Sequence, residues 1–183
     1  MTRDREIRTP RLRLRPFSAA DASGLLVLFQ DEQVRRYLLD GAVVDESWVD
    51  GEIADSADRF RSGSAGLWTI TAESAGILVG FAGFRPFFDP PELQLVYGLH
   101  PHHWGRGLAT EAARGVIRFA FETCGFPVVR AATDTPNRDS VRVMERLGMT
   151  FVKATGEGQW GTVYYQLTKR AWEESGFPGD DDG

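Results

Sequence analysis

Leucines and arginines alternate in the stretch RLRLRPF, which begins at Arg11. A period of two along the chain is typical of a strand that buries one face. After this strand, Ser18 is a candidate N-cap, and Asp21 three residues later completes a short capping box. The apolar run GLLVLF then predicts a helix, and DEQVRRYL continues it.

A second helix is predicted over residues 45–60, where Asp45 serves as the N-cap and Trp48, Ile53 and Phe60 are candidate core residues. The pattern changes after this helix. The stretches GLWTITAE, GILVGFAGF and ELQLVYGL are rich in β-branched and aromatic residues, and Gly, Ser and Pro separate them. These stretches predict three strands joined by short turns.

The most regular helical pattern lies in GLATEAARGVIRFAFETCGF, where Gly125 is expected to end the helix. Its apolar residues recur on one helical face: Leu108, Ala109, Ala112, Ala113, Val116, Ile117, Ala120 and Phe121. VVRAATD then predicts a strand, and NRDSVRVMERLGM predicts a short helix from an N-cap at Asn137 to a stop at Gly148. TFVKA and GTVYYQLT are expected to pair as antiparallel strands around TGEGQW.

This order of elements predicts one mixed α/β domain over residues 1–175, followed by a flexible acidic tail over residues 176–183. The length of 183 residues, with 42% hydrophobic and 26% charged residues, fits a single globular domain. The net charge of −5, without a long basic run, argues against a nucleic acid as the main partner.

The expected location is the cytoplasm, because the N-terminus is charged and lacks the apolar segment of a secretory signal. The longest dense apolar stretch, Leu25 to Phe29, is too short to span a bilayer, so no membrane association is expected. The single cysteine, Cys124, excludes an internal disulfide and a cysteine-only zinc site.

Candidate chemistry is concentrated in LHPHHWGRGLATEAARG, where a predicted strand runs into a predicted helix. The first N–H groups of a helix have no partner within it, and the helix dipole makes this end partly positive. Gly105 and Gly107 let successive N–H groups converge, and Arg106 adds positive charge. The turn therefore suits a pyrophosphate, although a glycine pair at such a place can also be turn chemistry alone.

The same stretch holds all three histidines of the chain, His100, His102 and His103. A metal site is not expected, because Pro101 and the turn oppose convergence of the imidazoles, and no cysteine or acidic residue lies within the cluster.

HHWGRGLATEA resembles the acetyl-CoA-binding motif Q/R-x-x-G-x-G/A of the GNAT N-acetyltransferases. It is closer to the RimJ/RimL-type branch, which carries a pattern like P-x-Y-W-G-K-G-Y-A-T-E-A. TPRLRLRPFSAADASGLLVLFQDEQVRRYL, NRDSVRVMERLGM and VYYQLTKRAW also resemble pieces of that branch, in the same order. The resemblance covers about residues 7–172.

This resemblance implies a GNAT-like fold, in which helices flank a mostly antiparallel sheet, and transfer of an acetyl group from acetyl-CoA to an amine by a monomer or homodimer. The strand from Gln94 to Leu99 would splay from the next strand and bind pantetheine through its backbone. By resemblance, the cofactor-binding residues would be Leu99, His103, Trp104, Gly105, Arg106, Gly107, Leu108, Asn137 and Ser140.

Departures from the family pattern concern the catalytic residues. Met144 stands where many GNAT enzymes have a tyrosine general acid, and a thioether cannot donate a proton. Gln94 stands where some relatives have a glutamate, so Glu92, two residues earlier on the same strand face, is the expected base, acting through water. Ser140 is the expected hydrogen-bond donor to the leaving thiolate. His102 replaces the usual Gln or Arg, but the binding groups there are mostly backbone.

The expected reaction is direct attack by a neutral amine on the thioester, with a backbone N–H near Val96–Tyr97 stabilising the oxyanion. An alternative is an acyl-CoA-binding module without catalysis. Another is a dinucleotide-binding oxidoreductase, since GRGLAT loosely resembles G-x-G-x-x-G/A, although Thr110 departs from the last position. The sequence leaves the amine acceptor open.

Overall fold

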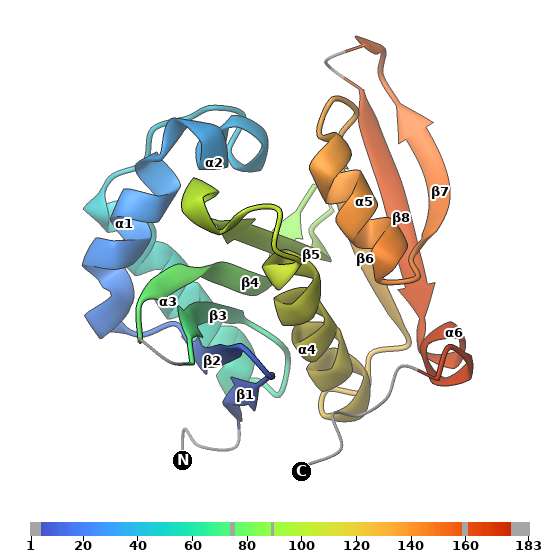
Figure 1. Cartoon of the computed structure of the whole chain (residues 1–183), viewed down its shortest axis with the longest axis horizontal. Helices are drawn as coiled ribbons and strands as arrows, with labels where there is room; N and C mark the ends of the chain where they lie inside the picture. The colour runs from blue at the N-terminus through green and yellow to red at the C-terminus, as the bar shows by residue number, and fades with distance from the viewer. Residues whose placement is uncertain (1–4, 74–75, 89, 159–160, 177–183) are drawn as a thin grey trace.

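The computed structural model describes residues 5–73, 76–88, 90–158 and 161–176, which form two antiparallel sheets with helices around them (Figure 1). The first sheet has the order β1-β2-β3-β4-β5: β1 (Ile7–Arg8), β2 (Leu12–Pro16), β3 (Leu67–Ala72), β4 (Leu78–Phe87) and β5 (Glu92–Leu99). The second has the order β6-β8-β7: β6 (Val128–Asp134), β7 (Thr150–Thr155) and β8 (Thr162–Thr168). The expected α/β class, with mostly antiparallel sheet, is confirmed.

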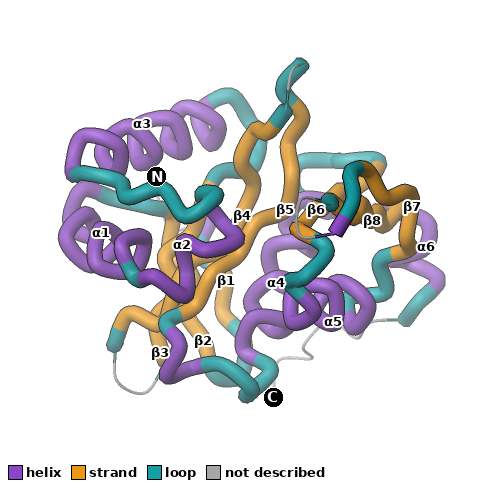
Figure 2. Tube along the Cα trace, turned by 90° about the horizontal axis from the view of Figure 1, so that it is seen from above, coloured by secondary structure: helices purple, strands orange, loops and turns teal. Residues whose placement is uncertain are grey.

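The helices are α1 (Ala22–Gln30), α2 (Glu32–Leu38), α3 (Glu46–Arg61), α4 (Leu108–Glu122), α5 (Arg138–Arg146) and α6 (Lys169–Glu174), with short 3-10 turns η2 (Ala19–Asp21) and η3 (Pro101–His103). Viewed from above, α1 to α3 lie on one side of the first sheet and α4 on the other (Figure 2). The strands and main helices match the predicted order, whereas β1 and α6 were not predicted.

Two hydrophobic cores follow from this layering. One packs the apolar face of α4 against the first sheet and continues to β6, β8, α5 and α6. The other packs α1, α2 and α3 on the opposite face, around Leu67, Phe81 and Val96. Phe60 is buried as predicted, but Trp48 and Ile53 are half-buried at the edge of the second core. Because the first core contains residues from both sheets, it holds them together.

Local capping explains where several helices begin and end. The Asp45 carboxylate accepts the Trp48 N–H at 2.9 Å, and Asn137 Oδ1 accepts the Ser140 N–H at 3.3 Å, so both predicted N-caps are confirmed. Gly148, at φ 75°, ends α5: its N–H bonds the Glu145 carbonyl, and that of Met149 bonds the Met144 carbonyl, as in a Schellman motif.

The prediction of one continuous helix up to residue 38 was wrong, because the helix breaks at Asp31. This residue has φ −59° and ψ 124°, outside the helical region, and its carboxylate accepts the N–H groups of Gln33 and Val34. An aspartate that caps a new helix competes with continuation of the old one.

Two further expectations lie partly outside the described residues. The TGEGQW turn joins β7 to β8, but its Gln159 and Trp160 are not described, and neither is most of the expected tail. Among the described residues, every helix is too short or too polar to cross a bilayer.

Candidate functional site

The site lies where the two sheets separate. β5 is the last strand of the first sheet and β6 the first strand of the second. At their N-terminal ends the strands are bridged by an ion pair, with Glu92 Oε1 3.1 Å from Arg130 Nη1. Further along, residues 95–97 and 131–133 line a cavity of about 90 Å³ between the same strands. The two strands therefore run in the same direction and splay apart, as the resemblance implied.

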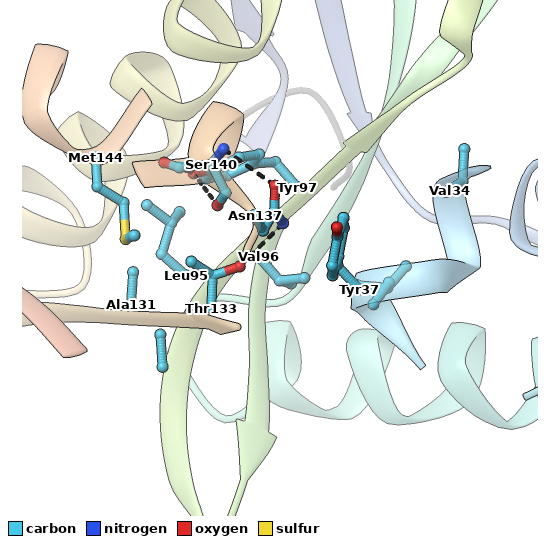
Figure 3. Close-up of a pocket in the computed structure, with 12 residues that line it drawn as sticks. Val34, Tyr37, Leu95, Val96, Tyr97, Ala131, Thr133, Asn137, Ser140 and Met144 are labelled. Carbon is cyan, nitrogen blue, oxygen red and sulfur yellow. Dashed lines mark hydrogen bonds between the residues drawn. The ribbon is translucent and has the colours of Figure 1, made fainter. Parts of the chain in front are cut away.

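Side chains from four elements line this cavity (Figure 3). Helix α2 contributes apolar residues and Tyr37, and α5 contributes polar groups and Met144. The lining residues are Val34, Tyr37, Leu38, Leu95, Val96, Tyr97, Ala131, Ala132, Thr133, Asn137, Ser140 and Met144. The lining combines apolar side chains with hydroxyl and amide groups from different elements, and a concave site with convergent polar groups is a candidate ligand site.

Beyond Leu99, the chain turns through η3 into α4. The Trp104 indole N–H donates to the Leu99 carbonyl at 2.8 Å, which holds the turn against the end of β5. Gly105 and Gly107 have φ values of 71° and 74°, a left-handed conformation that favours glycine. Gly107 is the N-cap of α4, so the first free N–H groups of this helix follow directly.

The turn thus brings together residues 103–108, the six consecutive cofactor-binding residues predicted there. Trp104, Gly105, Arg106 and Gly107 are exposed, and Leu108 is buried under the helix. A Cβ built on Gly105 would meet no atom within 4 Å, so the outer side of the turn is open. Positive charge from Arg106 and the dipole of α4 would favour an anion at this turn.

Asn137, the N-cap of α5, and Ser140, in its first turn, both line the cavity. Asn137 Nδ2 donates to Thr133 Oγ1 at 3.0 Å, so the asparagine links α5 to β6. Ser140 Oγ lies 2.9 Å from the Tyr97 hydroxyl, which also lies 3.1 Å from the Ser140 carbonyl. A hydroxyl pair therefore spans the cavity from β5 to α5 (Figure 3).

The side chain of Tyr97 is a functional candidate that the sequence did not reveal, since only the backbone near Val96–Tyr97 was expected to act. In β5, Tyr97 occupies the same alternate positions as the buried Leu95 and Leu99. The sequence pattern therefore marks position 97 as a core position and does not indicate a functional hydroxyl. Burial raises the pKa of Tyr97 above its ordinary value, and the hydrogen bond with Ser140 opposes this only in part. The phenol therefore stays protonated and can act as a hydrogen-bond donor.

Met144 is fully buried on the cavity wall. Its sulfur is at most a weak acceptor, so the position of the missing tyrosine holds no proton donor.

Glu92 lies at the narrow end of the splay, outside the residues that line the cavity. Its carboxylate accepts the Gln94 amide N–H at 2.6 Å in addition to the ion pair with Arg130. The side chain is 42% exposed, so water reaches it. Contact with Gln94 agrees with the prediction that the two residues share a strand face, but the structure does not bring Glu92 and Ser140 together.

The three histidines lie at the start of the turn, and His102 and His103 belong to η3. Burial, and then the positive charge of Arg106, lowers the pKa of His103. Within the described ranges, no three His, Cys, Asp or Glu side chains are grouped as metal ligands would be. Cys124 lies beyond the other end of α4, and burial raises the pKa of its thiol, which disfavours the thiolate of a nucleophile.

Residues 11–150 match the profile of the family described as acetyltransferase (GNAT) domain. The uncharacterised protein YkkB of Bacillus subtilis is 30% identical over 151 residues, which cover 79% of this chain and 85% of that protein. The FsC-acetyl coenzyme A-N(2)-transacetylase of Aspergillus fumigatus is 28% identical over 189 residues, covering 91% of this chain and 77% of that protein.

Solved structures have the same fold. An acetyltransferase from Agrobacterium tumefaciens is 27% identical, with a TM-score of 0.74 over 88% of this chain and 93% of that chain. RimL, a ribosomal alpha-N-protein acetyltransferase solved in complex with coenzyme A, has a TM-score of 0.76 at 14% identity, over 91% of this chain and 99% of that chain. At that identity the likeness to RimL concerns the fold alone.

Proposed function

The chain belongs to the GNAT family of acetyltransferases, whose acetyl donor is acetyl-CoA, and we propose that it acetylates a primary amine by direct attack in a ternary complex. The observation that carries this proposal is the cavity between β5 and β6, which lies beside the glycine turn at the start of α4. The glycine turn and a cavity with hydroxyl groups thus flank the same strand end. This arrangement can hold the two ends of a long thioester.

The proposed donor site uses backbone groups first. The predicted donors include His103 and Trp104, but their N–H groups already donate to the His100 and Pro101 carbonyls in η3. N–H groups of residues 105–108 would therefore bind the pyrophosphate, and the free edge of β5 up to Leu99 would bind the pantetheine amides. Asn137 would contact the donor from α5, where its bond to Thr133 fixes its orientation.

Chemistry in this site requires the amine to lose two protons. The ammonium group loses the first to become a nucleophile; its nitrogen then bonds the acetyl carbon and loses the second, and the C–S bond breaks to release a thiolate. Glu92 is the proposed base, acting through water because its carboxylate is accessible but lies outside the cavity lining. An N–H on β5 near Val96–Tyr97 would stabilise the oxyanion.

The leaving thiolate would be stabilised on the opposite side, at Ser140. The single proton of the Tyr97 phenol can go to the Ser140 carbonyl or to Ser140 Oγ. When it is donated to Oγ, the Ser140 hydroxyl proton is free to point at sulfur. Since the raised pKa of Tyr97 opposes its ionisation, the pair would supply a hydrogen bond, not transfer a proton from the phenol. The thiolate can leave without being protonated by the enzyme, because a free thiol has a pKa near 8.5.

We place the enzyme near the RimJ/RimL-type branch because of the sequence pieces it shares with that branch. The acceptor would be a protein N-terminal α-amine or a small-molecule amine. Both acceptor classes share one requirement, a neutral primary amine that can reach the cavity past α2.

A thiol-release assay with acetyl-CoA against a panel of amines and N-terminal peptides tests this function. Release of CoA that depends on one amine class, with mass-spectrometric detection of the acetylated product, would support it. Thermal stabilisation by acetyl-CoA without release for any amine would favour the non-catalytic binding module. Equal stabilisation by NAD would favour the dinucleotide-binding alternative over a site that selects CoA.

A further inference from the structure

A partly buried carboxylate ties the first turn of α4 to the chain segment before β2. Glu111, whose side chain is only 15% exposed, accepts the Thr9 hydroxyl at 2.6 Å. It also accepts the Arg11 backbone N–H at 3.0 Å and the Arg11 Nε at 2.6 Å. This cluster, Thr9–Arg11–Glu111, joins residues about 100 positions apart at the base of the glycine turn.

The same Arg11 guanidinium continues to the glycine turn. Arg11 Nη1 donates to the carbonyl of Arg106 at 2.9 Å. In a planar trans peptide, the carbonyl of Arg106 and the N–H of Gly107 point in opposite directions. A contact that holds this carbonyl on the Arg11 side therefore directs the Gly107 N–H to the other side of the turn.

We propose that Arg11 is a positioning residue for the anion-binding turn, and that Glu111 holds it in place. The inference rests on the proposed function, because it assigns these residues to the pyrophosphate end of the donor site. The planar guanidinium suits the task, since it binds a carboxylate and a carbonyl at once with fixed geometry.

Electrostatics and positioning predict opposite outcomes for Glu111. A carboxylate one turn into the helix repels a bound phosphate, so a purely electrostatic view expects Glu111→Gln to strengthen binding. If Glu111 acts by holding Arg11, the same substitution weakens binding, because the Arg106 carbonyl is no longer fixed. The sign of the change therefore decides between the two roles.

The test measures CoA affinity by calorimetry in the full-length protein and its variants. We expect Arg11→Ala to weaken binding about tenfold (about 1.4 kcal/mol). Arg11→Lys should lose most of this affinity despite keeping the charge, because one ammonium cannot bridge both partners in fork geometry. Glu111→Gln should weaken binding severalfold. Arg8→Ala is the control, because the Arg8 guanidinium pairs with Glu6 at 3.0 Å and with Glu73 at 2.9 Å.

A truncated donor separates this role from a general loss of structure. S-acetyl-pantetheine lacks the pyrophosphate, so its turnover should change less than twofold in the Arg11 and Glu111 variants, while KM for acetyl-CoA rises. Equal losses with both donors would overturn the positioning role. So would tighter CoA binding by Glu111→Gln, or wild-type affinity in Arg11→Lys. Wild-type protein that binds no CoA would overturn the proposed function as well.

Discussion

Ser140 and Tyr97 are hydroxyl residues from different elements, and each changes what the other can do. Ser140→Ala removes the hydroxyl proposed to face the thiolate, and Tyr97→Phe removes its hydrogen-bond partner without altering the ring. We expect kcat to fall about tenfold in Ser140→Ala, as for one lost hydrogen bond to a charged group. Tyr97→Phe should fall less, and the double variant should match Ser140→Ala, since the two act as one unit.

Met144→Leu is the matched control for this pair, because the two side chains have similar volume and neither donates a proton. Its turnover should stay near wild type. Steady-state rates with saturating acetyl-CoA check these expectations, and additive losses in the double variant would contradict the hydroxyl pair. Because the pKa of Tyr97 is raised, we also expect no loss of rate up to pH 10 from ionisation of this phenol.

Glu92→Gln tests the base. It keeps the shape of the side chain but removes its ability to accept a proton, so turnover should fall by roughly 10²–10⁴ if proton removal limits the rate. The loss should shrink at high pH, where more of the amine is already neutral. A pH–rate profile with wild-type turnover throughout would leave a mechanism of positioning alone. Arg130→Gln keeps the Glu92 carboxylate but removes its ion-pair partner. Comparing it with Glu92→Gln separates the effect of positioning Glu92 from the effect of losing its proton-accepting group.

Asp134 offers a test of stability against pH. Burial, with a smaller effect from Asp40, raises the pKa of this carboxyl from its ordinary value of 3.8. The folded state then binds the proton more tightly than the unfolded state. The free energy of unfolding therefore falls as pH rises through the window that begins near 3.8 and ends at the raised pKa.

Asp134→Asn removes this titration, so it should raise the melting temperature at pH 7 and change it little at pH 3. Calorimetry at the two pH values measures the difference, with the exposed Asp50→Asn on α3 as the control. A variant that is less stable than wild type at pH 7 would show that the ionised carboxylate is favoured in the fold.

At the scale of elements, the turn from η3 into α4 depends on the backbone conformation of two glycines. Both Gly105 and Gly107 have positive φ, where a β-branched side chain is strained. Gly105→Val and Gly107→Val should therefore disturb the N–H groups of the turn locally. A Cβ at Gly105 meets no atom within 4 Å, and one at Gly107 comes no closer than 3.8 Å to Arg11, so packing is not disrupted.

We expect CoA affinity to fall at least tenfold in either valine variant, while circular dichroism shows the native helix content. Gly41→Val serves as the control, since Gly41 also has positive φ and open space around it but lies before α3. Unchanged CoA affinity in Gly105→Val and Gly107→Val would remove the turn from the donor site.

At the scale of the whole molecule, a shared core predicts that the two sheets unfold together. Trp68 is buried in the first sheet, and Trp172 on α6 packs against Phe121 of α4 beside the second sheet. Tryptophan fluorescence and circular dichroism should therefore give coincident urea transitions, as expected for one domain. Two separate transitions would indicate that the sheets are independent units.

Acetyl-CoA should raise the midpoint of this single transition, because the ligand would bind between β5 and β6 only in the folded state. The shift should grow with ligand concentration and should be reduced in Gly107→Val. The same shift with ATP or NAD would argue that the turn binds phosphate without selecting the pantetheine arm.

Much of the fold could be predicted because the relevant interactions are local. Strand and helix periods follow from which side chains share a face, and the caps at Asp45 and Asn137 and the stop at Gly148 involve partners within a few residues. The glycine turn was equally visible, since positive φ at Gly105 and Gly107 is a property of the residues themselves. These signals indicated where the donor end of the proposed site would lie.

The rest depended on contacts between residues far apart in sequence, which no local pattern specifies. Tyr97 meets Ser140 across 43 positions, and Arg11 meets Glu111 across 100. Glu92 pairs with Arg130 only because β5 and β6 converge there before they splay. Local propensity determined the elements and the turn, whereas the packing of two sheets around one core decided which hydroxyls, carboxylates and guanidinium groups share the site.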